Sequence, residues 1–398
     1  MHQIPRRVFN QAFSQSTYQQ FIADLNGTYD WTISFRVAES PVFVPREFKH
    51  QLLQASEQII DVLVAPDYKE KTQNAIPPDY KVPHEHDHPL FFTIDMAVCE
   101  GKNGQLIPQL IELQGCPTIF CYQELVARKY REYFPIPDDY EYLFSGLTPE
   151  SYLDLLREVI LGGYEPQNVI LLEVDPDTQH TRIDFLATED KIGIKSVCIS
   201  EVIKEDNNLF YVLDGEKTPI YRIYNRVIFD ELVQRPDKHG SFRLTKAEGV
   251  EWAGHPNWFF QLSKYTLPLL DSPYVPKTWY LSDLKEFPPD LENYVLKPLY
   301  SFSGSGIQFD LKPGDLETIA NPEAYILQRK VTYAPAIQTP DGTGVKCEIR
   351  LMYIWPEKET RPRLVANLAR LSQGKMIGVK YNKDRDWVGG SVCFFEPG

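Results

Sequence analysis

The segment 293–311 most constrains how this chain folds, because it joins a short apolar run to a loop of serine and glycine. The run 294–296 ends at Lys297, the small-residue loop is 301–306, and 307–309 is again strand-like. This order is typical of a β-hairpin with a glycine-rich tip. Glycine lets backbone amides approach an anion, and a neighbouring lysine supplies a point charge for phosphate. We interpret the segment as a hairpin that covers nucleotide phosphates; an ordinary hairpin without a ligand is the alternative.

The bulk composition fits a globular protein with more than one domain. The chain has 398 residues, with 43% hydrophobic and 24% charged residues, which is enough for a sizeable core. A net charge of −14 argues against a nucleic-acid partner but leaves room for a small anionic ligand in a local basic pocket. No CxxC pair occurs among the six cysteines, so we expect reduced, buried thiols rather than zinc or a redox pair. No apolar run is long enough to predict a signal peptide or a membrane span, so we expect a cytoplasmic protein without a membrane partner.

Two apolar runs, 90–98 and 106–114, are predicted to form an antiparallel hairpin because an Asn-Gly pair lies between them. Successive side chains of a strand point to opposite faces of the sheet, so alternate residues share a face. With the turn near Lys102, the Asp95 carboxylate should lie diagonally across from Glu112. The residues expected on this face are Asp95 on the first strand and Leu110, Glu112 and Gln114 on the second.

This face of the predicted hairpin is a candidate magnesium site. Carboxylate and amide oxygens such as those of Asp95, Glu112 and Gln114 suit Mg²⁺, and polar groups on apolar strands are costly unless they hold something. The alternative is that they face water, as in any two-sided antiparallel sheet. A second candidate, the histidine-rich segment 83–89, is bracketed by prolines and crowds its ligands, so we favour a loop there over a metal site.

The middle of the chain has the pattern of a small α/β unit. A buried-strand run at 168–174, helical spacing at 181–191 and a second run at 196–200 predict a βαβ unit with parallel strands. No GxGxxG motif follows a strand, which argues against a dinucleotide site. Thr148 before Pro149 predicts the start of a helix. Further helices are predicted at 9–25, 48–64, 122–133, 149–161 and 258–270, and further strands at 208–213, 219–228, 274–281, 325–331, 347–355 and 363–371.

Taken together, these motifs resemble the ATP-grasp ligases. The resemblance rests on Lys264 in LSKYTLPLL, Lys297-Pro298 before SFSGSG, Gln328 in a strand, Glu348-Ile-Arg350, and the strand that ends at Arg370. It implies that ATP is held by two lysines, the glycine-rich loop and the strand with the glutamine. Because Glu112-Leu-Gln114 precedes these elements, the order is similar to the circularly permuted group that includes glutathionylspermidine synthetase.

The resemblance implies an α+β fold of ATP-grasp-like, circularly permuted order with a small α/β subdomain. It covers the chain from about Phe91 onward and leaves the first eighty or so residues without an assignment. The expected units are an N-terminal helical region (1–85), a hairpin and helix with the metal strand (86–145), the α/β subdomain (146–255) and the nucleotide-binding lobes (256–398).

Two departures from the family pattern bear on catalysis. Gln114 stands where the family has asparagine, which keeps the amide oxygen but lengthens the arm. Thr93 stands where the synthetase has an arginine that stabilises the transferring phosphoryl group. Arg370 or Arg350 is the expected replacement.

The function implied is that of an ATP- and Mg²⁺-dependent ligase that joins a carboxylate to an amine through an acyl-phosphate, on an amino acid, peptide or polyamine. One alternative is a catalytically inactive nucleotide- or peptide-binding protein on the same scaffold; another is an unrelated α+β protein with a chance Gly-Ser hairpin. Candidate substrate residues are Arg222, Tyr224, Asn225 and Arg226. The predicted site residues are Arg370 and Arg350 for catalysis, Lys264, Lys297, Ser303, Gly304, Ser305, Gly306 and Gln328 for ATP, and Asp95, Glu112 and Gln114 for magnesium.

Overall fold

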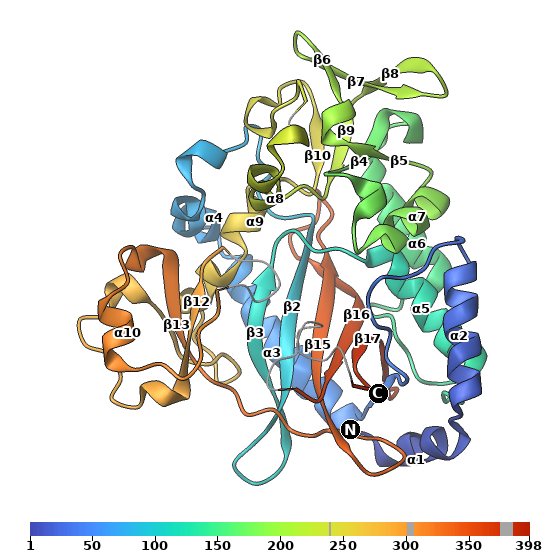
Figure 1. Cartoon of the computed structure of the whole chain (residues 1–398), viewed down its shortest axis with the longest axis vertical. Helices are drawn as coiled ribbons and strands as arrows, with labels where there is room; N and C mark the ends of the chain where they lie inside the picture. The colour runs from blue at the N-terminus through green and yellow to red at the C-terminus, as the bar shows by residue number, and fades with distance from the viewer. Residues whose placement is uncertain (239, 301–305, 375–384) are drawn as a thin grey trace.

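The computed structural model describes residues 1–238, 240–300, 306–374 and 385–398. Within them the chain mixes α-helices with several separate β-sheets (Figure 1). The α-helices are α1 (Gln3–Ala12), α2 (Gln15–Gly27), α3 (Arg46–Leu63), α4 (Tyr68–Thr72), α5 (Phe120–Tyr133), α6 (Pro149–Leu161), α7 (Arg182–Ile192), α8 (Phe229–Gln234), α9 (Trp258–Gln261) and α10 (Pro313–Glu317).

The largest sheet, called the main sheet below, has the strand order β17-β16-β15-β2-β3, with β14 paired to β15. All of its strand pairs are antiparallel. The early hairpin therefore lies beside strands from the last part of the chain (Figure 1). Its strands are β2 (Phe91–Glu100), β3 (Leu106–Gln114), β14 (Ile337–Gln338), β15 (Gly344–Ile354), β16 (Arg363–Ser372) and β17 (Gly389–Ser391).

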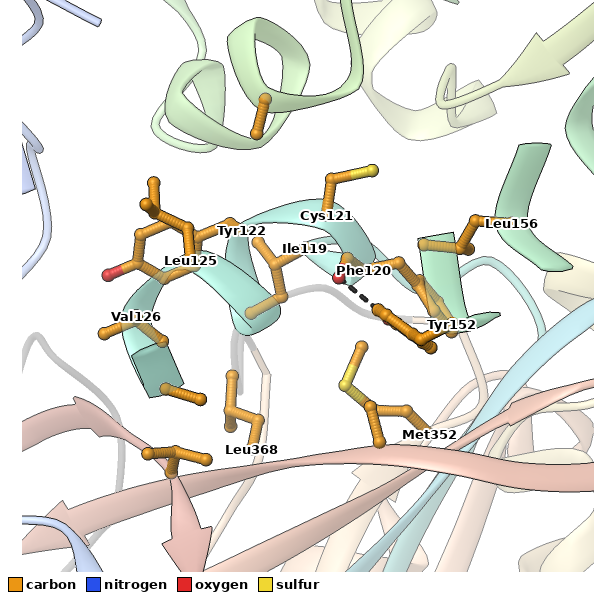
Figure 2. Close-up of a cluster of buried hydrophobic side chains, with 14 of the residues drawn as sticks. Ile119, Phe120, Cys121, Tyr122, Leu125, Val126, Tyr152, Leu156, Met352 and Leu368 are labelled. Atoms are coloured by element: carbon orange, nitrogen blue, oxygen red, sulfur yellow. Dashed lines mark hydrogen bonds between the residues drawn. The ribbon is translucent and has the colours of Figure 1, made fainter. Parts of the chain in front are cut away.

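The two faces of the main sheet differ in what covers them. One face carries Ile94, Ile349 and Leu351, which belong to the same apolar cluster as Leu52 and Ile59 of α3. The other face is covered by α5 over only part of its area. There Met352 of β15 and Leu368 of β16 pack beneath α5, and the Tyr152 hydroxyl of α6 donates to the Phe120 carbonyl at 2.8 Å (Figure 2). The rest of that face carries charged side chains.

The middle of the chain forms a parallel sheet with the order β10-β9-β4-β5. Strands β4 and β5 are joined through α7, which confirms the predicted βαβ unit. The predicted start of α6 is also confirmed, since the Thr148 hydroxyl accepts from the Ser151 amide and Pro149 is the first helical residue. A small antiparallel sheet, β6-β7-β8, projects from this region (Figure 1). These strands are β4 (Val169–Glu173), β5 (Lys195–Cys198), β6 (Ile203–Glu205), β7 (Asn208–Leu213), β8 (Glu216–Ile220), β9 (Arg222–Asn225) and β10 (Glu251–Ala253).

The predicted glycine-rich hairpin begins in a third sheet with the order β11-β13-β12. Its first arm is β12 (Tyr294–Pro298), as expected, whereas its second arm is reduced to one bridge between Leu296 and Gln308. The serine and glycine tip at 301–305 lies outside the described residues. The other strands are β11 (Thr278–Tyr280) and β13 (Tyr325–Arg329), and a separate parallel pair joins β1 (Val42–Val44) to β18 (Cys393–Phe395).

Three predicted elements were wrong. The helix expected at 9–25 is two helices, because Ser14 leaves the helical conformation and caps α2 by accepting from the Thr17 amide. The helix expected at 258–270 is the short α9 followed by a 3₁₀ helix, Lys264–Leu269, which contains Pro268. The strand expected at 219–228 is divided between β8 and β9, which belong to different sheets.

Other expectations agree with the structure. The histidine-rich segment 83–89 is a loop. Its Glu85 accepts hydrogen bonds from Asn257 at 2.8 Å and from Gln261. All six cysteines are free thiols. Among the described helices, none has both the length and the apolar character needed to cross a membrane.

Candidate functional site

The part of the main sheet that does not pack against α5 brings charged residues from four strands onto one face, called the polar face below. In the register, Asp95 lies opposite Arg350 on one side and Glu112 on the other. Glu348 of β15 lies opposite Arg370 of β16. Directly opposed residues point to the same face, as do alternate residues of one strand. The polar face therefore consists of Asp95, Glu112, Glu348, Arg350 and Arg370, and it brings together the four strands that carry Asp95, Glu112, Arg350 and Arg370.

Asp95 is the most completely enclosed of these groups. Its Oδ1 and Oδ2 accept from Nε and Nη2 of Arg350, each at 2.7 Å, and Oδ2 also accepts from Arg370. The Asp95 side chain is 1% exposed. Burial alone would raise the pKa of Asp95, but the two guanidinium groups outweigh burial and hold the pKa below its ordinary value. Asp95 is therefore a carboxylate whose oxygens are both used by arginine.

Glu348 is the second buried carboxyl of the polar face. Its Oε2 lies 3.3 Å from Arg370, and its Oε1 accepts from the Tyr333 hydroxyl. Burial is the main cause that raises the pKa of Glu348; the nearby carboxylates of Asp95 and Glu112 add to it, and Arg370 opposes it. Burial and the neighbouring carboxylates thus favour the protonated form of Glu348, and Arg370 favours the ionised form.

A β-bulge at Ile111 gives β3 its shape beside this face. The partners of Asp95 and Met96 are Glu112 and Leu110, so the register skips Ile111. Because of the extra residue, Leu110 joins the apolar cluster on the opposite face, and our expectation that it shares a face with Glu112 was wrong. For the same reason Glu112 lies directly opposite Asp95 rather than diagonally from it.

The Ile111 bulge also contacts β12, the strand of the third sheet that carries Lys297. The Lys297 amine of β12 donates to the Ile111 carbonyl at 3.2 Å. Burial lowers the pKa of Lys297 to about 8; Glu112 and Glu348 act against this change, and the Lys264 ammonium adds to it. Glu112 and Lys264 are thus both close enough to Lys297 to shift its pKa. The structure brings the early acidic hairpin and the late lysine strand together.

Gln328 faces the same way as Lys297. Residues Val295 and Gln328 are directly opposed, as are Lys297 and Ile326, so all four share one face of the β11-β13-β12 sheet. The Gln328 residue is 2% exposed, and its Nε2 has no hydrogen-bond partner among the described residues. A buried amide without a partner is costly, so this atom fits a hydrogen-bonding ligand.

The residues predicted to hold magnesium are neighbours, but they are not equally open to a metal. Glu112 accepts from the Gln114 amide at 2.6 Å, while both oxygens of Asp95 accept from arginine. In the described ranges, no group of three or more His, Cys, Asp or Glu is placed to hold a metal ion. Mg²⁺ commonly uses one or two protein carboxylates together with substrate phosphates. Of the polar-face carboxyls, Glu112 and Glu348 are the two that do not have both oxygens bonded to arginine among the described residues.

The glycine-rich loop contributes one described residue. Gly306 has a φ of +73°, and a Cβ there would lie 2.8 Å from Cγ of Pro298, so glycine suits this position in both conformation and space. The predicted phosphate contacts Ser303, Gly304 and Ser305 lie outside the described residues.

The four candidate substrate residues have different surroundings. Arg222 is 1% exposed and is held by Glu251 at 2.9 Å and Glu357 at 2.8 Å. Tyr224 is buried in an apolar cluster. Asn225 bonds to the Val227 backbone.

Arg226 reaches the segment that follows β3 with its side chain, whereas Asn225 meets the same segment through its backbone carbonyl, 4.0 Å from Sγ of Cys116. Its Nη1 contacts the Pro117 carbonyl and lies 3.8 Å from Sγ of Cys116. The Arg226 Nε is buried without a hydrogen-bond partner among the described residues. This makes Arg226 the best placed of the four for a ligand near Gln114.

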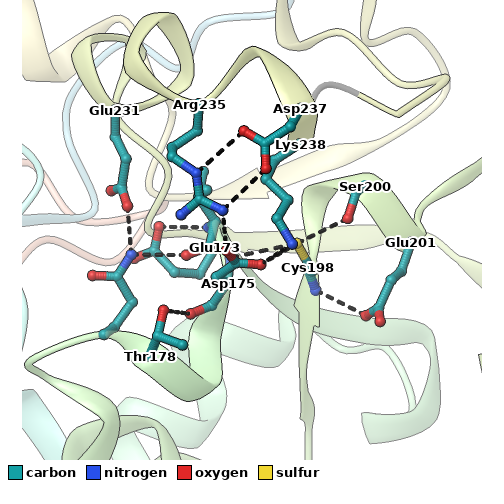
Figure 3. A network of polar contacts seen from close by, with 12 residues as sticks. Glu173, Asp175, Thr178, Cys198, Ser200, Glu201, Glu231, Arg235, Asp237 and Lys238 are labelled. Atoms are coloured by element: carbon teal, nitrogen blue, oxygen red, sulfur yellow. Dashed lines mark hydrogen bonds and ion pairs between the residues drawn. The ribbon is translucent and has the colours of Figure 1, made fainter.

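A second polar network lies where β4 and β5 end; we call it the strand-end network (Figure 3). Asp175 pairs with Arg235 at 2.5 Å and Lys238 at 2.6 Å, and Sγ of Cys198 accepts from the Asp175 amide at 3.4 Å. Glu173 is 5% exposed, and burial raises its pKa to about 8 although Arg226 acts in the opposite direction.

Sequence analysis named Glu348 in the Glu348-Ile-Arg350 motif but gave it no role, and it missed Tyr333. Alternation with Arg350 on β15 places Glu348 on the same face as that arginine. Tyr333 lies in a connection with no motif, so only the structure places it against Glu348.

Comparison with known proteins gives one fold-level finding. No protein-family model matches this sequence, and no curated protein matches it. Among solved structures, the chain is similar to the apo form of a glutathione synthetase-like effector from Globodera pallida. The TM-score is 0.60 at 11% sequence identity, and the match covers 100% of this chain and 98% of the effector. The two proteins share a fold.

Proposed function

We propose that this protein is an ATP- and Mg²⁺-dependent ligase that forms an amide between a carboxylic acid and an amine, on an ATP-grasp-like fold of circularly permuted order. The observation that carries the proposal is the contact between Lys297 and the Ile111 bulge, which joins the phosphate-binding lysine to the strand of Glu112 and Gln114. The fold likeness to a glutathione synthetase-like effector supports it.

The described residues fit a nucleotide. Lys297 and Lys264 are both 6% exposed, and an ammonium group is a point charge suited to phosphate. With Gln328 they would hold ATP, and Gly306 would lie at the end of the loop that covers its phosphates. Ser303, Gly304 and Ser305 complete the proposed phosphate loop.

The polar face fits a magnesium ion through Glu112 and Glu348, with Gln114 beside them. Bound magnesium would neutralise charge on the phosphates. Asp95, which we expected to be a ligand, holds Arg350 and Arg370 in place in this arrangement. Those arginines are the groups that would meet the acyl-phosphate, since preorganised cations stabilise developing charge.

The proposed chemistry needs no separate nucleophile. ATP phosphorylates the substrate carboxylate, the amine attacks the acyl-phosphate carbon, and phosphate leaves as the amide forms. The protein positions the reactants and neutralises their charge. Arg226 is the candidate contact for the acid, because its guanidinium lies beside the segment that follows the metal strand.

Nucleotide binding is tested by calorimetry with ATP and Mg²⁺ on the unchanged protein and on Lys297→Ala. We expect this variant to lose binding, by about 100-fold or more, because a buried charge opposite phosphate is removed. Lys285→Ala is the matched control, since Lys285 is exposed. Unchanged ATP affinity in Lys297→Ala would refute the site.

A second candidate function is nucleotide or peptide binding without turnover. Two features favour it: Thr93 replaces the expected arginine, and both Asp95 oxygens are used by arginine. A screen for ADP release across a panel of acids and amines separates the candidates. ADP release that requires both an acid and an amine supports the ligase, whereas ATP binding without ADP release across the panel supports the second function.

A further inference from the structure

Gly115, the first residue after β3, is in unusually close contact with another segment. A Cβ at this position would lie 2.1 Å from the carbonyl oxygen of Trp258 and 3.0 Å from Cβ of Leu262. Gly115 is absent from the positive-φ residues, so the restriction is one of space rather than of backbone conformation. Any other residue would need the two segments to move apart.

The segments that meet at Gly115 carry different parts of the proposed site. Strand β3 carries Glu112 and Gln114 just before the glycine. On the other side, the Trp258 carbonyl accepts from the Leu262 amide at 3.1 Å and closes the turn of α9. Lys264 follows two residues later at the start of the 3₁₀ helix. Gly115 therefore lies at a close contact between β3 and the segment that leads to Lys264.

Side-chain contacts with Glu85 and Tyr68 hold α9 in place. Asn257 donates to Glu85 at 2.8 Å, and Gln261 donates to the other oxygen of the same carboxylate at 2.5 Å. The Trp258 indole stacks on Tyr68 with 6.5 Å between the ring centroids. These contacts fix the lysine segment against β3.

We propose that Gly115 is a positioning residue that sets the separation between Glu112 and Lys264, so that magnesium and nucleotide bind as one unit. This inference rests on the proposed function. Relieving the 2.1 Å contact to 3.0 Å requires a displacement of 0.9 Å. A displacement near 1 Å lowers the reaction rate by roughly 100-fold where catalysis depends on the exact position of a group.

The test compares the unchanged protein, Gly115→Ala and Gly27→Ala, each titrated calorimetrically with ATP in the presence and absence of Mg²⁺. Gly27→Ala is the matched control, because a Cβ there meets nothing within 4 Å. We expect the unchanged protein and the control to bind ATP more tightly with Mg²⁺. In Gly115→Ala the Mg²⁺-dependent gain in ATP affinity should fall by about tenfold or more, because Glu112 and Lys264 would no longer be placed to contact the same triphosphate. Thermal unfolding of each variant separates this effect from a general loss of stability.

Crystal structures of the unchanged protein and Gly115→Ala give a readout that does not need nucleotide. Displacement of 258–264 relative to Glu112 supports the proposal, and an unmoved Lys264 overturns it. An unchanged Mg²⁺ enhancement in the folded variant also overturns it. If the unchanged protein binds no ATP, the proposed function fails, while the displacement still decides whether Gly115 positions the segments.

A second variant covers the case in which Gly115→Ala does not fold. Adding Glu85→Ala removes the carboxylate that holds α9 from behind, so the helix has room to retreat. We expect the double variant to fold with Lys264 displaced and the Mg²⁺ enhancement still reduced, and Glu85→Ala alone to keep it. A double variant with full enhancement contradicts the proposal.

Discussion

The polar face and the strand-end network both bury a carboxyl group, but they treat it in opposite ways. Asp95 receives two guanidinium groups and its pKa is lowered, whereas Glu173 receives one backbone hydrogen bond, from the Val174 amide at 2.8 Å, and its pKa rises to about 8. Burial opposes ionisation of both groups. The difference teaches that burial raises the pKa of a carboxyl group unless direct charged partners, such as the two arginines of Asp95, outweigh it.

This comparison matters for function because the two regions adjoin through Arg226. The guanidinium of Arg226 lowers the pKa of Glu173 from one side and contacts the Pro117 carbonyl on the other. A ligand that engaged Arg226 would withdraw the principal cation that stabilises ionised Glu173. The strand-end network is thus electrostatically coupled to the segment that follows β3.

The largest effect is expected for Asp95→Asn, which keeps the shape of the side chain and removes its charge. Breaking a buried ion pair leaves the arginines uncompensated and costs about 3–5 kcal/mol. Urea denaturation at pH 7 measures the loss. The control is Glu359→Gln, which removes the carboxylate of a partly exposed pair with Arg363. Equal free energies of unfolding for Asp95→Asn and the unchanged protein would show that the charge of Asp95 does not contribute to stability.

The matched change in the other region, Glu173→Gln, should be nearly neutral below pH 5 and stabilising at pH 9. The pKa of about 8 in the folded protein lies above the ordinary glutamate value of 4.5, so between these two pH values the folded protein holds a proton that the unfolded chain releases. The stability contributed by Glu173 is fully present below pH 4.5 and is lost as the pH rises to 8. The difference in the free energy of unfolding between Glu173→Gln and the unchanged protein should grow by roughly 1.4 kcal/mol per pH unit in that interval. Urea midpoints that differ equally at pH 5 and pH 9 would contradict it.

A smaller effect is expected on nucleotide affinity as the pH changes. Lys297, like Glu173, lacks an ion-pair partner among the described residues, and its lowered pKa is about 8. Only the protonated amine attracts phosphate, so affinity should fall about tenfold per unit above pH 8. Lys297→Arg should remove this dependence because arginine stays charged. Calorimetric titrations between pH 7 and pH 9.5 test both expectations, and parallel pH profiles would disprove the role of Lys297.

The smallest effect is expected for Lys238→Ala in the strand-end network. Lys238 is solvent-accessible, and Arg235 still pairs with Asp175 after the change. Exposed ion pairs contribute little to stability. The urea midpoint should stay within error of that of the unchanged protein, and a clear decrease would show that this network depends on its outer cations.

Local patterns predicted much of the fold. Thr148 and Pro149 determine where α6 begins, and alternation with an Asn-Gly turn located β3 to the residue. The element from Trp258 onward was harder, because its apolar spacing suits a helix while Ser263 and Pro268 redirect the backbone into a 3₁₀ helix. Where local sequence signals predict different structures, the contacts with the rest of the chain decide between them.

The site was less predictable, because its partners come from distant strands. Asp95 and Arg350 were each identified as site residues, but their hydrogen bonds depend on the register of β15 against β2. The bulge at Ile111 has no glycine or proline to mark it, and it decides which β3 side chains face Asp95. Such pairings over 255 residues follow from tertiary packing rather than from neighbouring residues.

The central position of β15 in the main sheet has a consequence during synthesis. While a ribosome is still making residues 344–354, the hairpin of β2 and β3 is complete but the outer edge of β2 has no strand beside it. An apolar strand with an open edge attracts other chains, and pairings across such long separations form slowly. The nascent chain therefore carries an aggregation-prone edge through most of its translation, and shielding by a chaperone would raise the yield of folded protein.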